Sequence, residues 1–131
     1  MIFVDTGGWF VSIVPTDKNH DKARDWFLQN REPLVTTNYI VDETLTLFRA
    51  RGEYQRALQI GEQFFDGSLS GVYDLSGEDI AESWETFKRF SDKEWSFTDC
   101  SIKVVMEKLG ITHAFAFDEH FKQFGSIIVV P

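Results

Sequence analysis

The chain begins with the apolar run Ile2-Phe3-Val4, which is followed directly by the carboxylate Asp5. The pattern returns near the other end, where Ala114-Phe115-Ala116-Phe117 precedes Asp118. Short runs that are apolar throughout are typical of strands buried on both faces, as in a parallel sheet. Ligands of open parallel sheets bind at the carboxyl ends of the strands, so we expect Asp5 and Asp118 at one edge of the sheet.

Longer stretches with helical spacing separate the apolar runs, and the order of elements reads βααβααβααβαβ. The expected strands are Ile2–Val4, Leu34–Thr36 and Val72–Leu75, with two more around Phe115 and Ile128. Four helices are expected at Trp9–Val14, after Gly7 and Gly8, and at His20–Asn30, Glu53–Phe65 and Glu119–Phe124. A further helix should be capped by Asn38 and end before Gly52, and another should open with a capping box of Ser76 and Asp79. The last should be capped by Ser96 or Thr98 and end at Gly110, with Leu109 facing inward. This alternation predicts the α/β class, with a mostly parallel sheet of about five short strands covered on both sides by helices.

Length and composition limit the kind of protein further. A chain of 131 residues with 43% hydrophobic content is expected to form a single domain, 1–131, with its own core. The one cysteine, Cys100, excludes an internal disulfide, and we expect it to fill core space. No signal-peptide pattern is present, and the longest apolar runs are far shorter than a membrane span. These features predict a soluble, cytoplasmic protein with no membrane partner.

The formal charge of −8, from 21 acidic and 13 basic residues, repels phosphate backbones. Nucleic acid is therefore disfavoured as a passive ligand. The objection weakens if acidic residues are buried around divalent ions, because the ions invert the local charge and bind phosphate oxygens themselves.

Two further carboxylates interrupt the apolar stripes of predicted helices. Glu43 lies three residues after Ile40 and four before Leu47, and Asp99 lies three before Ile102. Residues three or four apart share a helical face, so we expect both acids to point inward with the core residues. Together with Asp5 and Asp118 they form a candidate cluster, called here the acidic quartet.

Each acid of the quartet has a plainer interpretation when it is taken alone. An aspartate after a strand is often a helix cap, and Asp99 in a first helical turn is favoured by the helix dipole. Buried carboxylates need a partner, however, and no lysine or arginine occurs at a matching position. A bound cation would supply the missing charge. An all-oxygen site without a histidine or cysteine constellation favours Mg²⁺ or Mn²⁺ over zinc.

The residues resemble those of PIN-domain nucleases, and most of all the VapC-type toxins of toxin–antitoxin systems. The resemblance covers the whole chain and is carried by Val4-Asp5-Thr6, by Glu43 inside a helix, by Ser96-Phe97-Thr98-Asp99-Cys100, and by Phe117-Asp118-Glu119-His120-Phe121. It implies a PIN-like three-layer α/β/α fold and a Mg²⁺- or Mn²⁺-dependent endoribonuclease. By resemblance, Asp5, Glu43, Asp99 and Asp118 match the family's catalytic and metal-binding acids, and Thr6 and Thr98 match hydroxyl positions beside them.

The resemblance also implies roles and partners. Asp5 is expected to be the central or bridging metal ligand, Asp99 and Asp118 complete the site, and Glu43 either binds metal through water or helps to remove a proton. RNA is the implied substrate. The implied protein partners are a second copy of the chain and a small antitoxin whose apolar helix and basic residue block the acidic cleft.

Other functions and residues stay open at the level of sequence. A structure-selective DNA nuclease and a non-catalytic metal-binding interaction module are alternatives, whereas a phosphoacceptor receiver is disfavoured because no lysine ends a late strand. His120 is interpreted as a surface or capping residue rather than a phosphate contact, and Asp42 as a solvated neighbour of Glu43. The aromatic content of 15% predicts rings at an interface as well as in the core. Candidates for both are Trp9, Phe10, Trp26, Phe48, Phe64 and Phe65.

Overall fold

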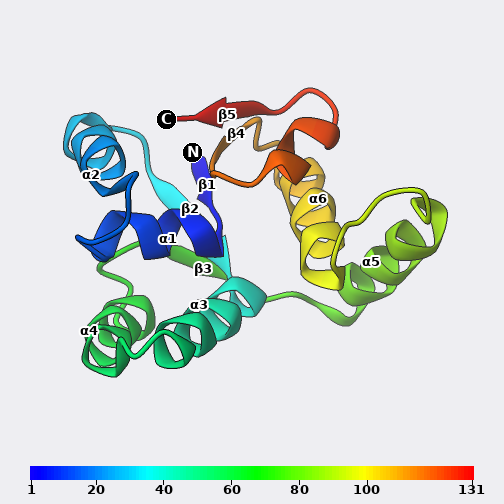
Figure 1. Ribbon diagram of the computed structural model, residues 1–131. Coiled ribbons are helices and arrows are strands. Elements are labelled where there is room, and N and C mark those ends of the chain that lie inside the picture. The colour runs from blue at the N-terminus through cyan, green and yellow to red at the C-terminus, as the bar shows by residue number, and fades with distance from the viewer.

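The computed structural model describes residues 1–131 and contains one five-stranded sheet (Figure 1). The strands are β1 (Ile2–Val4), β2 (Leu34–Thr37), β3 (Gly71–Tyr73), β4 (His113–Phe115) and β5 (Ile128–Val130). They lie in the order β3-β2-β1-β4-β5, and all four pairings are parallel. The prediction of about five short, mostly parallel strands is confirmed, and the observed sheet is wholly parallel.

Six α-helices and one short 3₁₀ helix, η1, connect the strands. Their bounds are α1 (Thr6–Ile13), α2 (His20–Gln29), α3 (Asn38–Ala50), α4 (Tyr54–Phe65), α5 (Gly77–Arg89), α6 (Phe97–Leu109) and η1 (Glu119–Gln123). The predicted capping box of Ser76 and Asp79 is present at the start of α5. A second capping box, formed by Ser96 and Asp99, opens α6, which ends at the left-handed Gly110.

The strand order creates a crevice at β1, because the chain first builds the sheet outward through β2 and β3 and then returns to the other side of β1 with β4 and β5. Right-handed crossovers in opposite directions put the two sets of connecting helices on opposite faces of the sheet. Figure 1 shows α1 and α2 on one side and α6 with α5 on the other. Ligands bind at such a reversal point, and it lies between β1 and β4.

The core is built from the apolar strands and the helix faces that cover them. Phe3, Val4 and Phe115 are completely buried in the middle strands. Gly8 in α1 allows the helix to approach β4 closely, since a Cβ atom there would lie 2.7 Å from the Phe115 ring and 2.9 Å from its carbonyl oxygen. Close packing of α1 on β4 therefore depends on the missing side chain at residue 8.

Some local predictions were wrong, each for a local reason. Helix α1 begins at Thr6 rather than near Trp9, because the Asp5 side chain caps it. Gly7 and Gly8 therefore lie in its first turn. Thr37, not Asn38, caps α3, and the Asn38 side chain instead accepts a hydrogen bond from the Leu75 amide. Leu109, expected to face inward, is 40% exposed in the last turn of α6.

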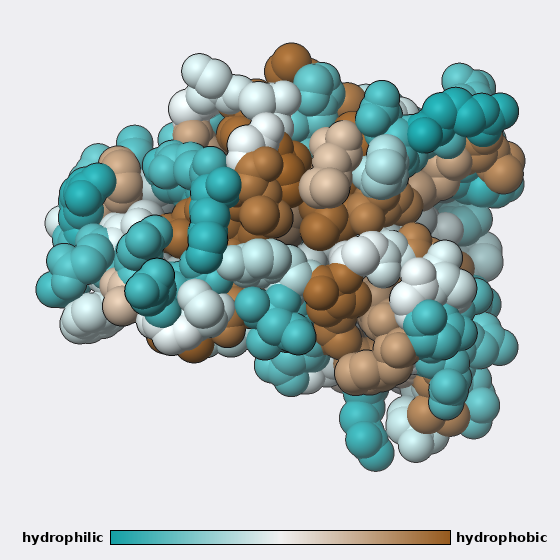
Figure 2. Space-filling view, turned by 180° about the vertical axis from the view of Figure 1, so that it is seen from behind, coloured by the Kyte–Doolittle hydropathy of each residue, from teal (hydrophilic) through white to brown (hydrophobic).

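The aromatic residues divide between core and surface, as the composition predicted. Trp9, Phe48 and Phe64 are buried, whereas Phe65 is 80% exposed. Hydrophobic side chains also reach the surface on the face shown in Figure 2. The other large, exposed apolar residues are Met1, Leu28, Tyr54, Leu58, Ile80, Trp84, Phe87, Leu109 and Ile128.

Candidate metal centre

Asp5 is the buried member of the acidic quartet. It follows β1 directly, and its backbone nitrogen donates to the carbonyl of Phe115 in β4 at 3.4 Å. Its Oδ1 atom accepts a 2.8 Å hydrogen bond from the Gly8 amide, and Asp5 thereby caps α1. The carboxylate is thereby fixed at the reversal point of the sheet, between the ends of β1 and β4.

Glu43 reaches the site from α3 through a hydroxyl. The side chain of Thr6, the residue after Asp5, donates a 2.5 Å hydrogen bond to Oε1 of Glu43. Glu43 itself is exposed, so the expectation that it points inward with the core was wrong. Its place on α3 lies at the boundary between the buried face and solvent, because Val41 and Thr44 on either side of it are buried while Asp42 is exposed.

Asp99 and Asp118 arrive from the other side of the crevice, and both cap helices. Oδ2 of Asp99 accepts from the Ser96 amide at 3.0 Å, which completes the capping box of α6. Oδ1 of Asp118 accepts from the His120 amide at 2.8 Å, which starts η1. Both acids therefore cap helices, as their plainer interpretation held, and both also lie at the crevice. Capping is what fixes their side chains there.

The other three carboxylates of the quartet act on Asp5. Burial raises the pKa of Asp5 to about 7, and the negative charges of Asp118, Glu43 and Asp99 raise it in the same direction. The Gly8 amide opposes these effects, but it does not outweigh them. With its pKa raised by burial, Asp5 keeps more of its protonated form near neutral pH than an ordinary aspartate does.

The interpretation of His120 as a surface or capping residue missed the contacts of its ring. Its Nδ1 atom lies 2.9 Å from Oδ2 of Asp99 and 3.4 Å from Oδ1 of Asp118. Ligand atoms from these three residues lie within 4.8 Å of one another, the spacing of a group able to hold a metal ion. The available signal was the Asp118-Glu119-His120 spacing, because an aspartate that caps a helix by accepting from the amide two residues later lies close to that residue.

The two threonines expected beside the quartet occupy different positions. Thr6 is buried and contacts Glu43, as described above. Thr98 is half-buried and lines a depression of about 380 Å³ together with Tyr39, Asp42, Glu43 and Thr46. Thr98 thus borders the approach to the quartet, whereas Thr6 orients one of its members.

The donor set suits a hard divalent cation. It offers carboxylate oxygens from two sides of one crevice, and the buried Asp5 has only an amide as its hydrogen-bond partner. Oxygen ligands of this kind favour Mg²⁺ or Mn²⁺, and a nearby imidazole is more readily accepted by Mn²⁺ than by Mg²⁺. The expected absence of a histidine from the site was wrong, because His120 contacts two of the four acids.

A parallel α/β sheet with acids gathered at its reversal point is the fold and site of a particular class of protein. The comparison with family models identifies that class. The model of the PIN domain matches residues 2–127, and the chain belongs to this family.

Two curated relatives extend the match over the whole chain. The 23S rRNA-specific endonuclease VapC20 of Mycobacterium tuberculosis, from strains CDC 1551 / Oshkosh and ATCC 25618 / H37Rv, is 30% identical over 131 residues, which cover 100% of this chain and 99% of the relative. The crystal structure of Mycobacterium tuberculosis VapC20, described as a Sarcin-Ricin loop cleaving toxin, superimposes with a TM-score of 0.91 at 30% identity and covers 100% of both chains. The predicted resemblance to VapC-type PIN domains is confirmed, and so is the three-layer α/β/α fold.

Proposed function

We propose that this protein is a Mg²⁺- or Mn²⁺-dependent endoribonuclease and the toxin of a type II toxin–antitoxin pair. The observation that carries the proposal is the convergence of the acidic quartet on one crevice, where Asp5 has a raised pKa because of burial and its three acidic neighbours. Perturbed acids in a crevice are typical of functional sites. The likeness to VapC20 supports nuclease chemistry over a purely structural role.

The likeness also supports an RNA substrate. VapC20 is named as an endonuclease specific for 23S rRNA, and its crystal structure is described as that of a toxin that cleaves the Sarcin-Ricin loop. We extend the substrate class to this chain, with ribosomal RNA as the first RNA to test.

The positions of the acids indicate different roles in hydrolysis. Asp5, Asp99 and Asp118 would hold the metal, with Asp5 in the central place because it is buried and the charges of the other three acids all act on it. A bound divalent ion supplies a water of lowered pKa and neutralises charge on the phosphate. Thr6 engages Oε1 of Glu43, which leaves the other carboxylate oxygen to orient a water or accept its proton.

We further propose a cytoplasmic location, a homodimer and a small cognate antitoxin. The apolar surface of the α3–α4 hairpin supports protein partners, since a depression there is lined by Leu45, Leu58 and the exposed Phe65. The excess of negative charge supports a basic residue on the antitoxin. No helix in the structure is long and apolar enough to span a membrane.

The proposal is tested by incubating purified protein with RNA and with DNA in Mg²⁺, Mn²⁺ or chelator. We expect cleavage of RNA that requires the metal and that Asp99→Asn abolishes. Glu43→Gln should reduce cleavage strongly, and the matched control Glu62→Gln, at an exposed position of α4, should leave it nearly unchanged. Cleavage that survives chelator or Asp99→Asn would exclude the mechanism, and cleavage of DNA alone would favour a DNA nuclease.

A further inference from the structure

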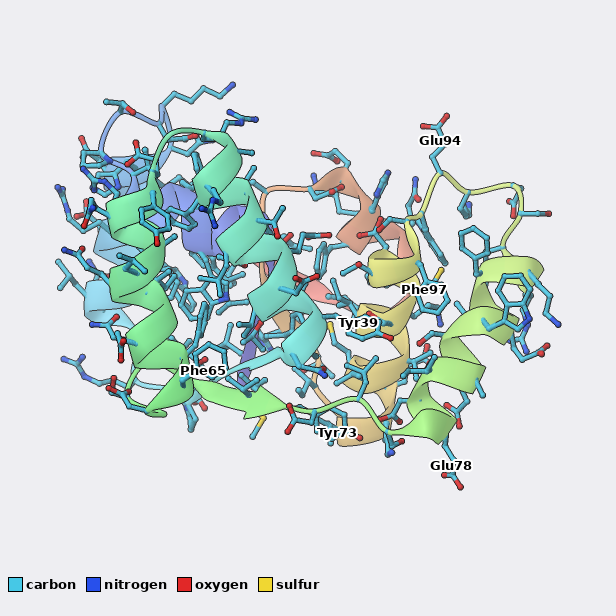
Figure 3. All side chains as sticks on the ribbon, turned by 90° about the horizontal axis from the view of Figure 1, so that it is seen from below. Tyr39, Phe65, Tyr73, Glu78, Glu94 and Phe97 are labelled. Atoms are coloured by element: carbon cyan, nitrogen blue, oxygen red, sulfur yellow. The ribbon has the colours of Figure 1, made fainter.

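A row of aromatic rings begins beside the acidic quartet and continues to the exposed surface of α5. The ring centroids of Tyr39 and Phe97 lie 6.4 Å apart, those of Phe97 and Phe87 6.2 Å, and those of Phe87 and Trp84 5.9 Å. These four residues, called here the aromatic row, come from α3, α6 and α5. Figure 3 shows Tyr39 and Phe97 next to each other where α3 faces the start of α6.

The inner end of the aromatic row borders the candidate metal centre. Tyr39 lines the same depression as Glu43 and Thr98. Phe97 is followed in sequence by Thr98 and Asp99 in the first turn of α6. A phosphodiester held at the quartet would therefore have its flanking nucleotides close to the first two rings of the row.

The outer end of the row is open to solvent. Trp84 is 50% exposed and Phe87 is 42% exposed, although aromatic rings of this size usually bury most of their surface. The two rings are stacked, with an angle of 18° between their planes. The Lys88 Nζ atom lies 5.5 Å from the centroid of the Trp84 ring and also pairs with Glu85. A cation thus accompanies the outermost ring.

The row is attached to a rigid part of the fold. Helices α5 and α6 are joined by Lys108, whose Nζ atom donates to Oδ1 of Asp79 at 2.8 Å, and Asp79 is only 1% exposed. The Tyr73 hydroxyl donates to the other oxygen of Asp79 at 2.7 Å. This junction, centred on the buried Asp79, holds α5 against α6 and therefore holds Phe87 near Phe97.

We propose that the aromatic row is a stacking surface for unpaired bases of single-stranded or loop RNA next to the scissile phosphate. The inference rests on the proposed ribonuclease function and specifies its substrate class. Aromatic side chains in succession, with a cation nearby, bind single strands because every base has a face that stacks. The continuity of the row with the quartet favours RNA, because a strand whose phosphate is held at the quartet extends along the surface that Tyr39 and Phe97 border.

The test compares leucine and aromatic substitutions at the outer end of the row. The double variant Trp84→Leu/Phe87→Leu keeps apolar bulk but removes stacking, whereas Trp84→Phe/Phe87→Tyr keeps the rings. Phe65→Leu is the matched control, since Phe65 is 80% exposed on α4, far from the row (Figure 3). All variants are made in the Asp99→Asn background, and binding of a fluorescein-labelled single-stranded oligoribonucleotide is measured by anisotropy in Mg²⁺.

We expect the leucine variant to bind the oligoribonucleotide about 5- to 100-fold more weakly, the range that the loss of one stacked base gives. The aromatic variant and Phe65→Leu should bind within about twofold of the Asp99→Asn parent. A labelled RNA duplex should show a much smaller effect of the leucine substitutions, because its bases are already stacked.

Equal binding by the leucine variant and the parent would overturn the inference. A leucine variant that binds RNA normally but changes its sedimentation behaviour would also overturn it, because the row would then belong to an interface between copies of the chain. Wild-type cleavage of RNA, measured in parallel, separates the two proposals. If wild-type protein cleaves RNA while the leucine variant binds normally, only the stacking surface is wrong; if wild-type protein neither binds nor cleaves RNA, both are wrong.

Discussion

The Nδ1 atom of His120 lies 2.9 Å from Oδ2 of Asp99. The same atom lies 3.4 Å from Oδ1 of Asp118, so one imidazole connects an acid of α6 with the acid that caps η1, 19 residues later in sequence (118 − 99). The side chain of Asp99 is 15% exposed and that of His120 29% exposed, so this contact is partly shielded from solvent. His120 therefore helps to set the distance between Asp99 and Asp118.

His120→Ala should weaken metal binding about tenfold or more, because side chains that orient metal ligands typically contribute that much to affinity. Isothermal titration of the metal-free protein with Mn²⁺ measures the effect directly. His113→Ala is the control, since His113 contacts Thr112 at the start of β4 and no member of the quartet. Equal affinity of the His120 and His113 variants would show that the imidazole does not organise the site.

Asp5 should make the metal-free protein less stable as the pH rises. Its folded-state pKa of about 7 exceeds the ordinary value of 3.8, so between these values the folded protein holds a proton that the unfolded chain has released. The free energy of unfolding therefore decreases from about pH 4 to about pH 7 and then levels off. Asp5→Asn removes this loss and should raise stability near pH 8 by roughly 2–4 kcal/mol.

Urea unfolding in chelator at several pH values measures this effect. Asp42→Asn, which removes an exposed carboxylate of the same helix surface as Glu43, is the control and should change stability by less than about 0.5 kcal/mol. Asp5→Asn should nevertheless be inactive, because the central metal ligand is lost. If the Asp5 variant were no more stable than wild type near pH 8, the carboxylate would not be under the strain described.

Gly8→Ala should destabilise the protein by about 1–3 kcal/mol, because its new Cβ would overlap the ring and carbonyl of Phe115. Gly7→Ala is the matched control in the same helix. A Cβ at residue 7 would meet nothing closer than 3.8 Å, and replacing a helical glycine with alanine gains about 0.5–1 kcal/mol. The midpoint temperatures of thermal unfolding of the two variants should therefore shift in opposite directions from that of the wild type. Equal shifts would contradict the close approach of α1 to β4.

Thr6→Val should lower kcat without unfolding the protein. The substitution removes the hydroxyl that holds Oε1 of Glu43 but keeps the shape of the side chain. A hydrogen bond to a charged group contributes about 1.5–3 kcal/mol, so a decrease of roughly 10- to 100-fold is expected if Glu43 must be held in place. Thr6→Ser restores the hydroxyl and should recover most of the activity. Similar rates for the serine and valine variants would remove Thr6 from the mechanism.

Much of the fold was predictable because the strands are short and apolar throughout. Ile2–Val4 and the run around Phe115 pair directly in the structure, with Val4 opposite Phe115. The ends of elements were less predictable where a side chain acts as a cap, as Asp5 does for α1 and Thr37 for α3. Such capping depends on side-chain geometry that hydrophobic periodicity does not contain.

The proximity of some candidate site residues was predictable, but the contacts between them were not. Asp5 and Asp118 follow strands, and strand ends meet at one edge of a parallel sheet, so their proximity follows from topology. Glu43 lies at the edge of the buried face of α3, where the next residue, Thr44, is already buried. Hydrophobic periodicity did not show on which side of this edge the Glu43 side chain lies. The contact of His120 with Asp99 joins distant segments, and only the folded chain reveals it.

Crystals grown without metal and soaked in MnCl₂ test the central claim most directly, through the anomalous scattering of manganese. The account predicts a manganese peak in the crevice between β1 and β4, with carboxylate oxygens of Asp5, Asp99 and Asp118 roughly 2.1 Å away or joined to it through water. The peak should disappear in Asp5→Asn crystals treated in the same way. Manganese bound elsewhere, or a crevice without anomalous signal in wild-type crystals, would contradict the account.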